Sequence, residues 1–471
     1  MFLKRFYDDG LAQASYLIGC QATGDAIVID ANRDISQYTA VADAEKLRIT
    51  HVTETHIHAD YLSGSRELAK ATGAQMYLSA EGGKDWQYKF AAEDGATLLK
   101  DGDVIKVGNV QIKAMHTPGH TPEHLSFLVT DTASASEPMG IATGDFVFVG
   151  DVGRPDLLER AAKVANTMEA SAKQLFHSLE RFRSLPDFVQ VWPGHGAGSA
   201  CGKSLGAVPT STVGYEKRFN WGVGTTDEKT FVEMVLAGQP EPPLYFAEMK
   251  RINRDGPTIL GGFPSPAKGD RAALESALAA KVTVVDARPA DQFGKGHVRG
   301  TINIPFSKSF STWSGWLVKY DVDIHLIAVD EDTMRRAVRE LAMIGLDRVT
   351  QWYDACVVDE WKKSGKTLAT VKRTDMKSVA ERLKRGEINV LDVRNASEWA
   401  AGHLPGATHI PVGYLPDRIN EVPRDKPLVV HCQGGTRSAI ATSVLQKLGV
   451  KEVEDYGGGY SEWARSEGVI V

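Results

Sequence analysis

Residues 51–60 read HVTETHIHAD, a strand-like run that leads into a loop with two histidines and an aspartate. Three later strand-like runs lead into polar loops of the same kind, HTPGH at 116–120, TGD at 143–145 and PGHG at 193–196. Imidazoles and carboxylates that converge from strand ends are what a divalent metal requires. Strand-like runs that alternate with helical patterns, as at 161–184, predict a layered α/β fold.

This ordered set of motifs resembles the metallo-β-lactamase superfamily over about residues 1–240. The resemblance implies an αββα sandwich that holds metal at the strand ends. The usual motif of that family is His-x-His-x-Asp-His, but Tyr61 stands where the last histidine belongs. A phenol has a reference pKa of about 10 and is a poor zinc ligand at neutral pH. We therefore expect a damaged second metal position, which disfavours a binuclear zinc hydrolase.

The candidate metal ligands that remain are His56, His120 and Asp145. Two histidines and one carboxylate are the ligand set of non-haem Fe(II) oxygenases, which leaves positions open for a substrate and for O2. Within the superfamily this set resembles the persulfide dioxygenases, and GDVGRPDLL at 150–158 is similar to the same branch. The resemblance implies one Fe(II) per chain, O2 as co-substrate, and oxidation of a thiol persulfide to sulfite and the free thiol.

Three further polar residues of these motifs, His58, Asp60 and His195, are predicted to hydrogen-bond around the metal site rather than to bind the metal. Asp60 has the alternative role of capping the following helix. Cys201 follows His195 by a few residues. It is either a thiol beside the metal that accepts or presents sulfur, or a small buried residue.

Three residues are candidate contacts for an anionic thiol carrier: Arg154, Arg218 and Asn220. Arginine suits a carboxylate or a phosphate because its guanidinium presents a planar fork of donors. Solvated surface is the competing interpretation of Arg218 and Asn220. The sequence leaves open whether the carrier is glutathione, coenzyme A, another small thiol or a protein.

The C-terminal half contains an internal repeat, in which VVDARPADQFGKGHVRGTINIP at 284–305 aligns without a gap with VLDVRNASEWAAGHLPGATHIP at 390–411. It predicts two homologous α/β domains, which we place at 270–368 and 373–471. The Pro- and Gly-rich stretch at 241–269 is the predicted interdomain linker. Its apolar segment Leu244–Met249 favours, as an alternative, partial packing on the first domain.

The strand Leu428–His431 is followed by Cys432, a Gly-rich loop, Arg437 and a helical pattern. Loop N–H groups and the positive end of the helix dipole stabilise a thiolate at such a position. Arg437 adds a charge that suits sulfite or thiosulfate. Cys-x4-Arg with the flanking LDVR and GHLPGA elements resembles the rhodanese family, which implies a parallel-sheet α/β domain whose cysteine carries sulfur as a persulfide. The first copy has Asp330 at this position, so we expect it to be an inactive rhodanese-like domain.

Composition limits the other classes of function. A net charge of −6 argues against a nucleic-acid partner. No apolar stretch approaches the roughly 20 residues that span a bilayer, and no signal peptide is expected. The scattered cysteines indicate a reducing compartment, so we expect a cytoplasmic protein. The family resemblance implies a homo-oligomer.

The whole layout resembles bacterial fusion proteins of sulfide detoxification. In this chain, sulfite from the first domain and a persulfide on Cys432 would give thiosulfate. The reverse order, in which the rhodanese domain supplies the persulfide, is equally compatible with the sequence. Two alternatives remain. One is a glyoxalase II-like zinc thioesterase, which uses a metal-bound hydroxide. The other is a non-catalytic sulfur carrier or sensor.

Overall fold

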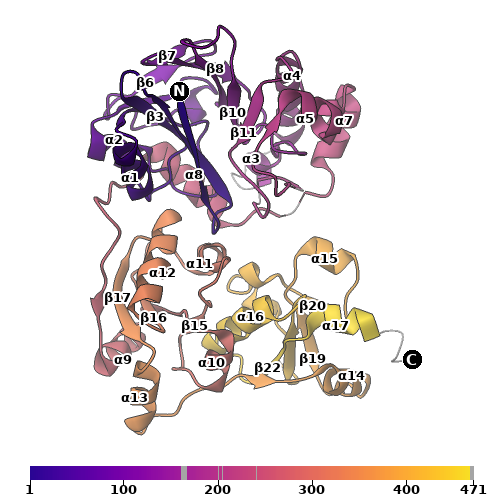
Figure 1. The fold of residues 1–471 in the computed structure, drawn as a ribbon. Helices are drawn as coiled ribbons and strands as arrows, with labels where there is room; N and C mark the ends of the chain where they lie inside the picture. Colours follow the sequence, from indigo (N-terminus) through magenta and orange to yellow (C-terminus); the bar gives the residue numbers. More distant parts are fainter. Residues whose placement is uncertain (161–166, 200, 204, 240, 467–471) are drawn as a thin grey trace. The chain divides into compact units, whose positions relative to one another are not determined.

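The computed structural model describes residues 1–160, 167–199, 201–203, 205–239 and 241–466 (Figure 1). The chain divides into two compact units, one formed mainly by Met1–Gly262 and the other mainly by the residues that follow. In the region of the helix predicted at 161–184, α4 covers Met168–Arg183, and residues 161–166 lie outside the described part. Residues 467–471, at the end of the last predicted domain, also lie outside it.

The first unit is built on two mixed sheets. The first sheet has the strand order β1-β2-β3-β4-β5-β6, antiparallel from β1 to β3 and parallel from β3 to β6. Its strands are Phe2–Asp8, Gln13–Cys20, Asp25–Ile29, Arg48–Thr53, Gln75–Ser79 and Thr97–Leu99. The second has the order β12-β11-β10-β9-β8-β7, antiparallel except for β10 with β11. In chain order its strands are Val104–Val107, Val110–His116, Leu125–Asp131, Gly140–Gly144, Gln190–Pro193 and Ser211–Thr212.

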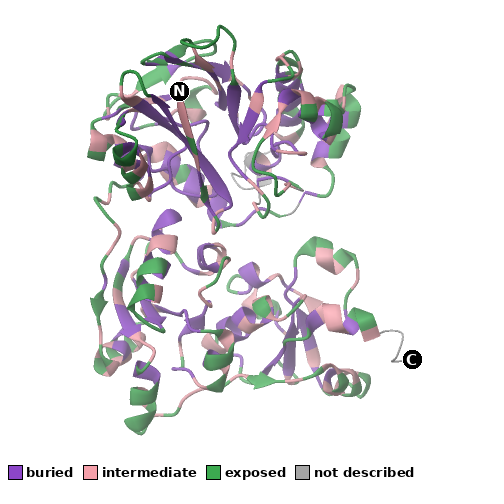
Figure 2. Ribbon diagram, viewed as in Figure 1, coloured by how far each residue is buried: buried purple, intermediate pink, exposed green. Residues whose placement is uncertain are grey.

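Apolar side chains from both sheets fill the space between them. Tyr16 and Ile18 of β2 belong to the same core cluster as Ile112 of β8 and Phe127 of β9. Strand β2 is buried along its whole length, as Figure 2 shows for the interior strands. Both faces of β2 are buried because one face meets the opposite sheet and the other meets helices.

Helices cover the outer face of each sheet. Tyr38 of α1 (Ser36–Ala44) and Leu68 of α2 (Ser65–Thr72) join the cluster on the first sheet. Phe176 of α4 and Phe231 of α7 (Glu228–Leu236) join the cluster on the second. The shorter helices are α3 (Leu157–Arg160), α5 (Val213–Phe219), α6 (Trp221–Gly224) and η1 (Lys84–Trp86). The predicted αββα sandwich is confirmed.

The predicted linker at 241–269 needs correction, because it contains helix α8 (Tyr245–Asp255), which belongs to the first unit. The Asn253 amide nitrogen donates to the carbonyl oxygens of His58 and Tyr61, both at 2.8 Å. Its Oδ1 accepts the N–H of Ser63 at 2.9 Å. The prolines and glycines that suggested a linker flank this helix rather than interrupt it. The alternative that this stretch packs on the first domain is the one the structure supports.

We expect Asn253→Ala to destabilise the first unit. The substitution leaves two buried carbonyl groups and one buried N–H without their partner, and each such group costs about 1–3 kcal/mol. Allowing for relaxation, the free energy of unfolding should fall by roughly 2–4 kcal/mol, or roughly 5–10 °C in the melting temperature of a domain of this size. Differential scanning fluorimetry measures this change. Asn109→Ala, at an exposed side chain, is the matched control, and equal melting of both variants would contradict the docking of α8.

The second unit contains two parallel sheets of the same order, β13-β17-β16-β14-β15 and β18-β22-β21-β19-β20. The strands of the first are Ala267–Lys268, Thr283–Asp286, Ile302–Asn303, Ile324–Ala328 and Val349–Asp354, numbered β13 to β17. Those of the second are Lys372–Arg373, Asn389–Asp392, Thr408–His409, Leu428–His431 and Val453–Tyr456, numbered β18 to β22. The sequence repeat is therefore a structural repeat.

Equivalent helices surround both sheets. In the first copy they are α9 (Arg271–Ala279), α10 (Ala290–Lys295), α11 (Phe310–Leu317), α12 (Glu331–Met343) and α13 (Val357–Lys363). In the second they are α14 (Met376–Lys384), α15 (Ala396–Ala400), η2 (Val412–Tyr414), η3 (Ile419–Glu421), α16 (Thr436–Lys447) and α17 (Gly459–Ser466). Among the described residues, no helix is both long and apolar enough to cross a bilayer.

Candidate metal centre and sulfur-carrier site

The structure brings His56, His120 and Asp145 together at the ends of β4, β8 and β10. Nε2 of His120 lies 3.5 Å from Oδ2 of Asp145, and Nε2 of His56 lies 3.9 Å from the same oxygen. One candidate ligand atom from each residue lies within 4.8 Å of the others. All three side chains are buried, so this convergence is part of the interior of the domain.

A hydrogen-bond chain fixes the orientation of the His56 ring. The Thr55 hydroxyl donates to Asp30 at 3.0 Å, and its oxygen lies 2.9 Å from Nδ1 of His56. Because the hydroxyl hydrogen is used by Asp30, we assign the proton of His56 to Nδ1, which donates to Thr55. The lone pair of Nε2 then faces Asp145, as a metal ligand requires.

His120 is oriented in the same way. Its Nδ1 lies 3.1 Å from the carbonyl oxygen of Arg154, an acceptor only, so Nδ1 carries the proton and Nε2 keeps the lone pair. A third ring, His124, was not predicted as part of the site. Its Nε2 accepts the N–H of Asp145 at 3.2 Å, and burial lowers its pKa to about 3, so it remains neutral and fixes the Asp145 loop.

Unsatisfied atoms show that these residues fit a cation. Within the described part of the chain, Nε2 of His56 and both carboxylate oxygens of Asp145 are buried without a hydrogen-bond partner. Buried polar atoms are almost always bonded, and a divalent metal between these atoms would satisfy them. Burial lowers the pKa of His56 and of His120 well below the usual value, so both imidazoles keep free lone pairs.

The predicted neighbours of the metal site have specific partners. His58 packs against the His56 ring, with centroids 4.2 Å apart, and its Nε2 lies 3.2 Å from Asp30. Asp60 pairs with His195, Oδ2 to Nε2 at 3.2 Å, and does not cap α2, whose N-cap residue is Gly64. The Tyr61 hydroxyl lies within hydrogen-bond distance of Gln13 and of the Asp30 carbonyl, at 3.3 and 3.4 Å.

Beside the first set, the structure gathers a second group of possible ligands, Asp60, His195 and Cys201, whose donor atoms lie within 4.8 Å of one another. Nε2 of His195 is also 3.3 Å from Oδ1 of Asp145, so the two groups adjoin. Cys201 is thus both buried and next to the candidate metal centre. Burial, with Asp145 and Asp60 nearby, raises the pKa of its thiol well above the usual value. The sequence predicted Asp60 and His195, and as one alternative Cys201, beside the metal, but not as a second group of ligands, because Tyr61 replaces the histidine of the usual motif.

The Cys432 loop has the geometry expected of a thiol site. Cys432 follows β21, and its sulfur accepts the N–H of Gly435 at 3.1 Å, at the start of α16. Gly435 has a φ of 99°, which favours glycine and turns its N–H toward the sulfur. The Arg437 guanidinium makes a two-point ion pair with Glu398, one contact being 2.7 Å. An incoming anion would therefore share Arg437 with this carboxylate.

The equivalent position of the first copy holds a carboxylate in place of the thiol. Asp330 follows β16, and its carboxylate accepts the N–H of Thr333 at 2.7 Å, as a helix cap does. Both copies retain a buried arginine–aspartate pair, Arg288 with Asp286 and Arg394 with Asp392, each with a contact of 2.6 Å. The scaffold is thus shared, and the thiol is present in the second copy.

Comparison with known proteins agrees with this geometry. Residues 8–195 match the model of the metallo-beta-lactamase superfamily, and residues 270–357 and 375–466 match the model of the rhodanese-like domain. The chain is 46% identical to a solved metallo-beta-lactamase from Staphylococcus aureus subsp. aureus COL, over 75% of this chain and 99% of that one, with a TM-score of 0.70. The chain belongs to the metallo-beta-lactamase superfamily.

Curated relatives of this superfamily member carry the names of hydrolases. It is 29% identical over 220 residues to a probable metallo-hydrolase from Burkholderia pseudomallei, covering 41% of this chain and 72% of the relative. It is 28% identical over 180 residues to a hydroxyacylglutathione hydrolase from Rhodospirillum rubrum, covering 38% of this chain and 60% of the relative. The chain is thus a metallo-beta-lactamase domain joined to two rhodanese-like domains, with possible metal ligands in the first.

In this metallo-beta-lactamase domain, the predicted carrier contacts lie in unlike places. The Arg154 guanidinium is fully buried and pairs with Asp156 at 2.8 Å, so it is enclosed in the protein. The Asn220 amide donates to the carbonyl oxygens of Phe148 and Asp151, at 3.2 and 2.8 Å, so its interpretation as solvated surface is wrong. Arg218 is exposed on α5.

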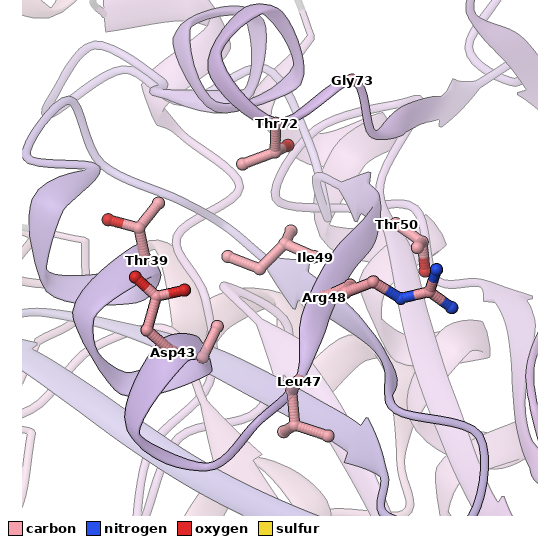
Figure 3. Close-up of a pocket in the computed structure, with 9 residues that line it drawn as sticks. Thr39, Asp43, Leu47, Arg48, Ile49, Thr50, Thr72 and Gly73 are labelled. Atoms are coloured by element: carbon pink, nitrogen blue, oxygen red, sulfur yellow. The ribbon is translucent and has the colours of Figure 1, made fainter.

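A separate surface pocket of the metallo-beta-lactamase domain lies between the end of α1, β4 and α2 (Figure 3). Its lining includes Asp43, Arg48 and Thr72 but neither histidine nor cysteine. The Arg48 guanidinium also pairs with Asp25 at 2.9 Å. The residues that line this pocket do not offer a metal-ligand set, so it is not the candidate metal centre.

Proposed function

We propose that the metallo-beta-lactamase domain is a mononuclear non-haem Fe(II) dioxygenase that oxidises a thiol persulfide to sulfite. We propose further that the second rhodanese-like domain transfers sulfane sulfur through Cys432, giving thiosulfate. The observation that carries the proposal is the donor set of two imidazoles and one carboxylate, with Tyr61 in place of a further histidine. A ferrous ion held by these residues would supply the redox chemistry with O2.

The proposed reactions balance. In the first, R-S-SH, O2 and H2O give R-SH, sulfite and two protons, and four electrons pass from the persulfide to O2. In the second, the Cys432 thiolate takes the outer sulfur of another R-S-SH, and R-SH leaves. Sulfite then attacks that outer sulfur, the S–S bond of the Cys432 persulfide breaks, and thiosulfate leaves with the Cys432 thiolate remaining. The product of the first domain is thereby a substrate of the second.

The residues around the candidate metal centre suit this chemistry by position. Thr55 and the Arg154 carbonyl hold the two imidazoles in their ligating orientation. His195 can hold a proton at Nε2 between Asp60 and Asp145, because its Nδ1 already donates to the Ala12 carbonyl at 2.9 Å. Although burial lowers the pKa of His195, these carboxylates raise it more, and the net shift is upward. A proton released by the persulfide or by water thus has a neighbouring site.

A glyoxalase II-like zinc thioesterase is the second candidate function, and a specific observation favours it. Asp60, His195 and Cys201 form a second donor group beside the first, and hydrolysis in such enzymes uses metal-bound hydroxide. The curated relatives named above are hydrolases, which supports the same alternative. Metal content and substrate choice separate the two candidates.

We expect protein loaded anaerobically with Fe(II) to retain one iron per chain and to consume O2 when given a small-molecule persulfide. Sulfite and thiosulfate should account for the oxidised sulfur, and chelation of the metal should remove the O2 uptake. Elemental analysis and an oxygen electrode make these measurements. Two zinc ions per chain with cleavage of a thioester, and no O2 uptake, would overturn the dioxygenase in favour of the hydrolase. Loss of the second zinc in Cys201→Ser would then assign that thiol as a ligand.

We propose a low-molecular-weight thiol persulfide as the substrate, with sulfite and thiosulfate as products. A cytoplasmic homo-oligomer without a nucleic-acid partner completes the proposal. The net charge of −6 supports the absence of a nucleic-acid partner, because phosphate backbones attract basic surfaces. Size-exclusion chromatography with light scattering tests the oligomeric state.

A further inference from the structure

Helix α8, which packs on the loop of His58 and Tyr61, carries a largely buried cation. Lys250 is 8% exposed, and the structure gives its ammonium no hydrogen bond or ion pair within the described residues. The ammonium lies 3.9 Å from the centroid of the Trp86 ring. Burial lowers its pKa to about 8, even though Glu123 opposes the shift. A buried lysine without a bonded partner is costly, and a bound anionic group would supply that partner.

The position of Lys250 follows from the elements that surround it. Asn253, one helical turn further along α8, bonds to the backbone of His58, Tyr61 and Ser63. The helix therefore covers the loop that carries His56. Burial is the main reason for the lowered pKa of His56, and the Lys250 charge adds to it. The same two influences act on the pKa of His120, together with the charge of His124.

Glu123 connects this cation to the loop of His56. Its Oε1 accepts the N–H of Ile57 at 2.8 Å, and its charge is the main electrostatic influence on Lys250. A side chain at Gly82 would lie 2.9 Å from both Glu123 and Trp86. The segment that carries Trp86 therefore packs directly on Glu123, which places the indole, the ammonium and the carboxylate in one cluster.

Several polar atoms of this cluster lack partners. Oε2 of Glu123, Oγ1 of Thr121 and the hydroxyl of Tyr88 are buried without a hydrogen bond among the described residues. Such atoms are rare in a native interior. Thr121 faces Glu123 and Tyr88 faces Glu54, so these polar atoms can serve each other. The unbonded ammonium is then the donor that remains for a polar group entering from outside. A half-buried Trp86 ring offers an apolar surface for the carbon chain of the same ligand.

We propose that Lys250 and Trp86 form a subsite that binds a carboxylate on the thiol carrier of the persulfide. This inference rests on the proposed dioxygenase function and names the substrate class of its site. The charge balance favours a carboxylate over a phosphate. Glu123 offsets the lysine charge, so a singly charged group is better matched than a dianion, and a lone lysine lacks the fork that grips phosphate.

The test compares two persulfides of similar size, those of 3-mercaptopropionate, which has a carboxylate, and of 2-mercaptoethanol, which is neutral. We expect the wild type to have the lower KM for the carboxylate. Lys250→Met should raise that KM by about 10- to 100-fold, since a charge-assisted hydrogen bond contributes about 1.5–3 kcal/mol. The kcat of Lys250→Met for the carboxylate persulfide should change by less than about threefold. Its KM and kcat for the neutral persulfide should stay within the same limit. Lys250→Arg should recover part of the loss, and Lys89→Met, at an exposed lysine paired with Asp255, is the control.

Equilibrium binding separates this inference from the proposed function. Isothermal titration of metal-free protein with 3-mercaptopropionate should show binding to wild type and to Lys89→Met, and a loss of about tenfold or more in Lys250→Met. Binding with this pattern, but no O2 uptake with either persulfide, would sustain the subsite and overturn the dioxygenase. O2 uptake with equal KM for both persulfides in wild type and Lys250→Met would sustain the dioxygenase and overturn the subsite.

Discussion

Asp145→Ala should reduce persulfide-dependent O2 uptake by at least about 100-fold, together with the iron content of the protein. Asp145 is the carboxylate of the proposed ligand set, and both of its oxygens are buried without hydrogen-bond partners within the described part of the chain. Even residues that only orient a metal ligand contribute about 10- to 100-fold to affinity or activity, so a ligand should contribute at least as much. Iron is measured by elemental analysis and O2 uptake with an electrode.

Two variants make this result specific. Asp145→Asn keeps the shape of the side chain but removes its charge, and should lose iron as the alanine variant does. Asp25→Asn removes a carboxylate that pairs with the exposed guanidinium of Arg48, and should behave as wild type. If Asp145→Ala kept its iron and its O2 uptake, Asp145 would not be a ligand of the working metal. Sulfur transfer from thiosulfate by the rhodanese-like domain should continue in each variant, which shows that the second unit remains folded.

Cys432→Ser should lower sulfur transfer by about 1000-fold or more, because a serine hydroxyl is a far weaker nucleophile than a thiolate and cannot carry sulfane sulfur as a persulfide. The substitution keeps a small polar group at the end of β21, so the loop that ends at Gly435 should persist. O2 uptake should remain within about twofold of wild type. Sulfite should then accumulate where wild type releases thiosulfate, as ion chromatography of the products would show.

Cys356→Ser is the matched control, since Cys356 is an exposed cysteine outside the Cys432 loop. It should transfer sulfur as wild type does. Continued thiosulfate formation by Cys432→Ser would mean that another thiol carries the sulfur, and Cys201 would be the first to replace. Loss of O2 uptake in Cys432→Ser would indicate the reverse order of coupling, in which the rhodanese-like domain supplies the persulfide.

Much of the architecture could be predicted because its signals are local. The apolar run at Leu428–His431 is strand β21, and the repeated segments around Asp286 and Asp392 end equivalent strands, β14 and β19. Strand and helix patterns repeat every few residues, so a short window of sequence contains them. The candidate ligands His56, His120 and Asp145 were recognisable for a related reason, since each follows a strand and belongs to an ordered set of motifs.

Contacts between distant segments could not be predicted in this way. Prolines around α8 suggested a linker, but Asn253 bonds to the loop of His58 and Tyr61. Besides burial, the charge of Lys250 on the same helix lowers the pKa of His56 and of His120. Nothing in the local sequence of α8 specifies these partners, because they depend on how the helix packs across the first unit.

The sequence by itself thus determined the order of domains, the strands that end in candidate ligands and the thiol of the second repeat, because each is a local pattern. Only the tertiary structure decided the surroundings of those residues. It placed Asp30 behind His58, His124 behind Asp145, and Cys201 beside Asp60 and His195. The physical reason is that burial and side-chain convergence depend on the packing of two sheets and their helices, which join segments far apart in the chain.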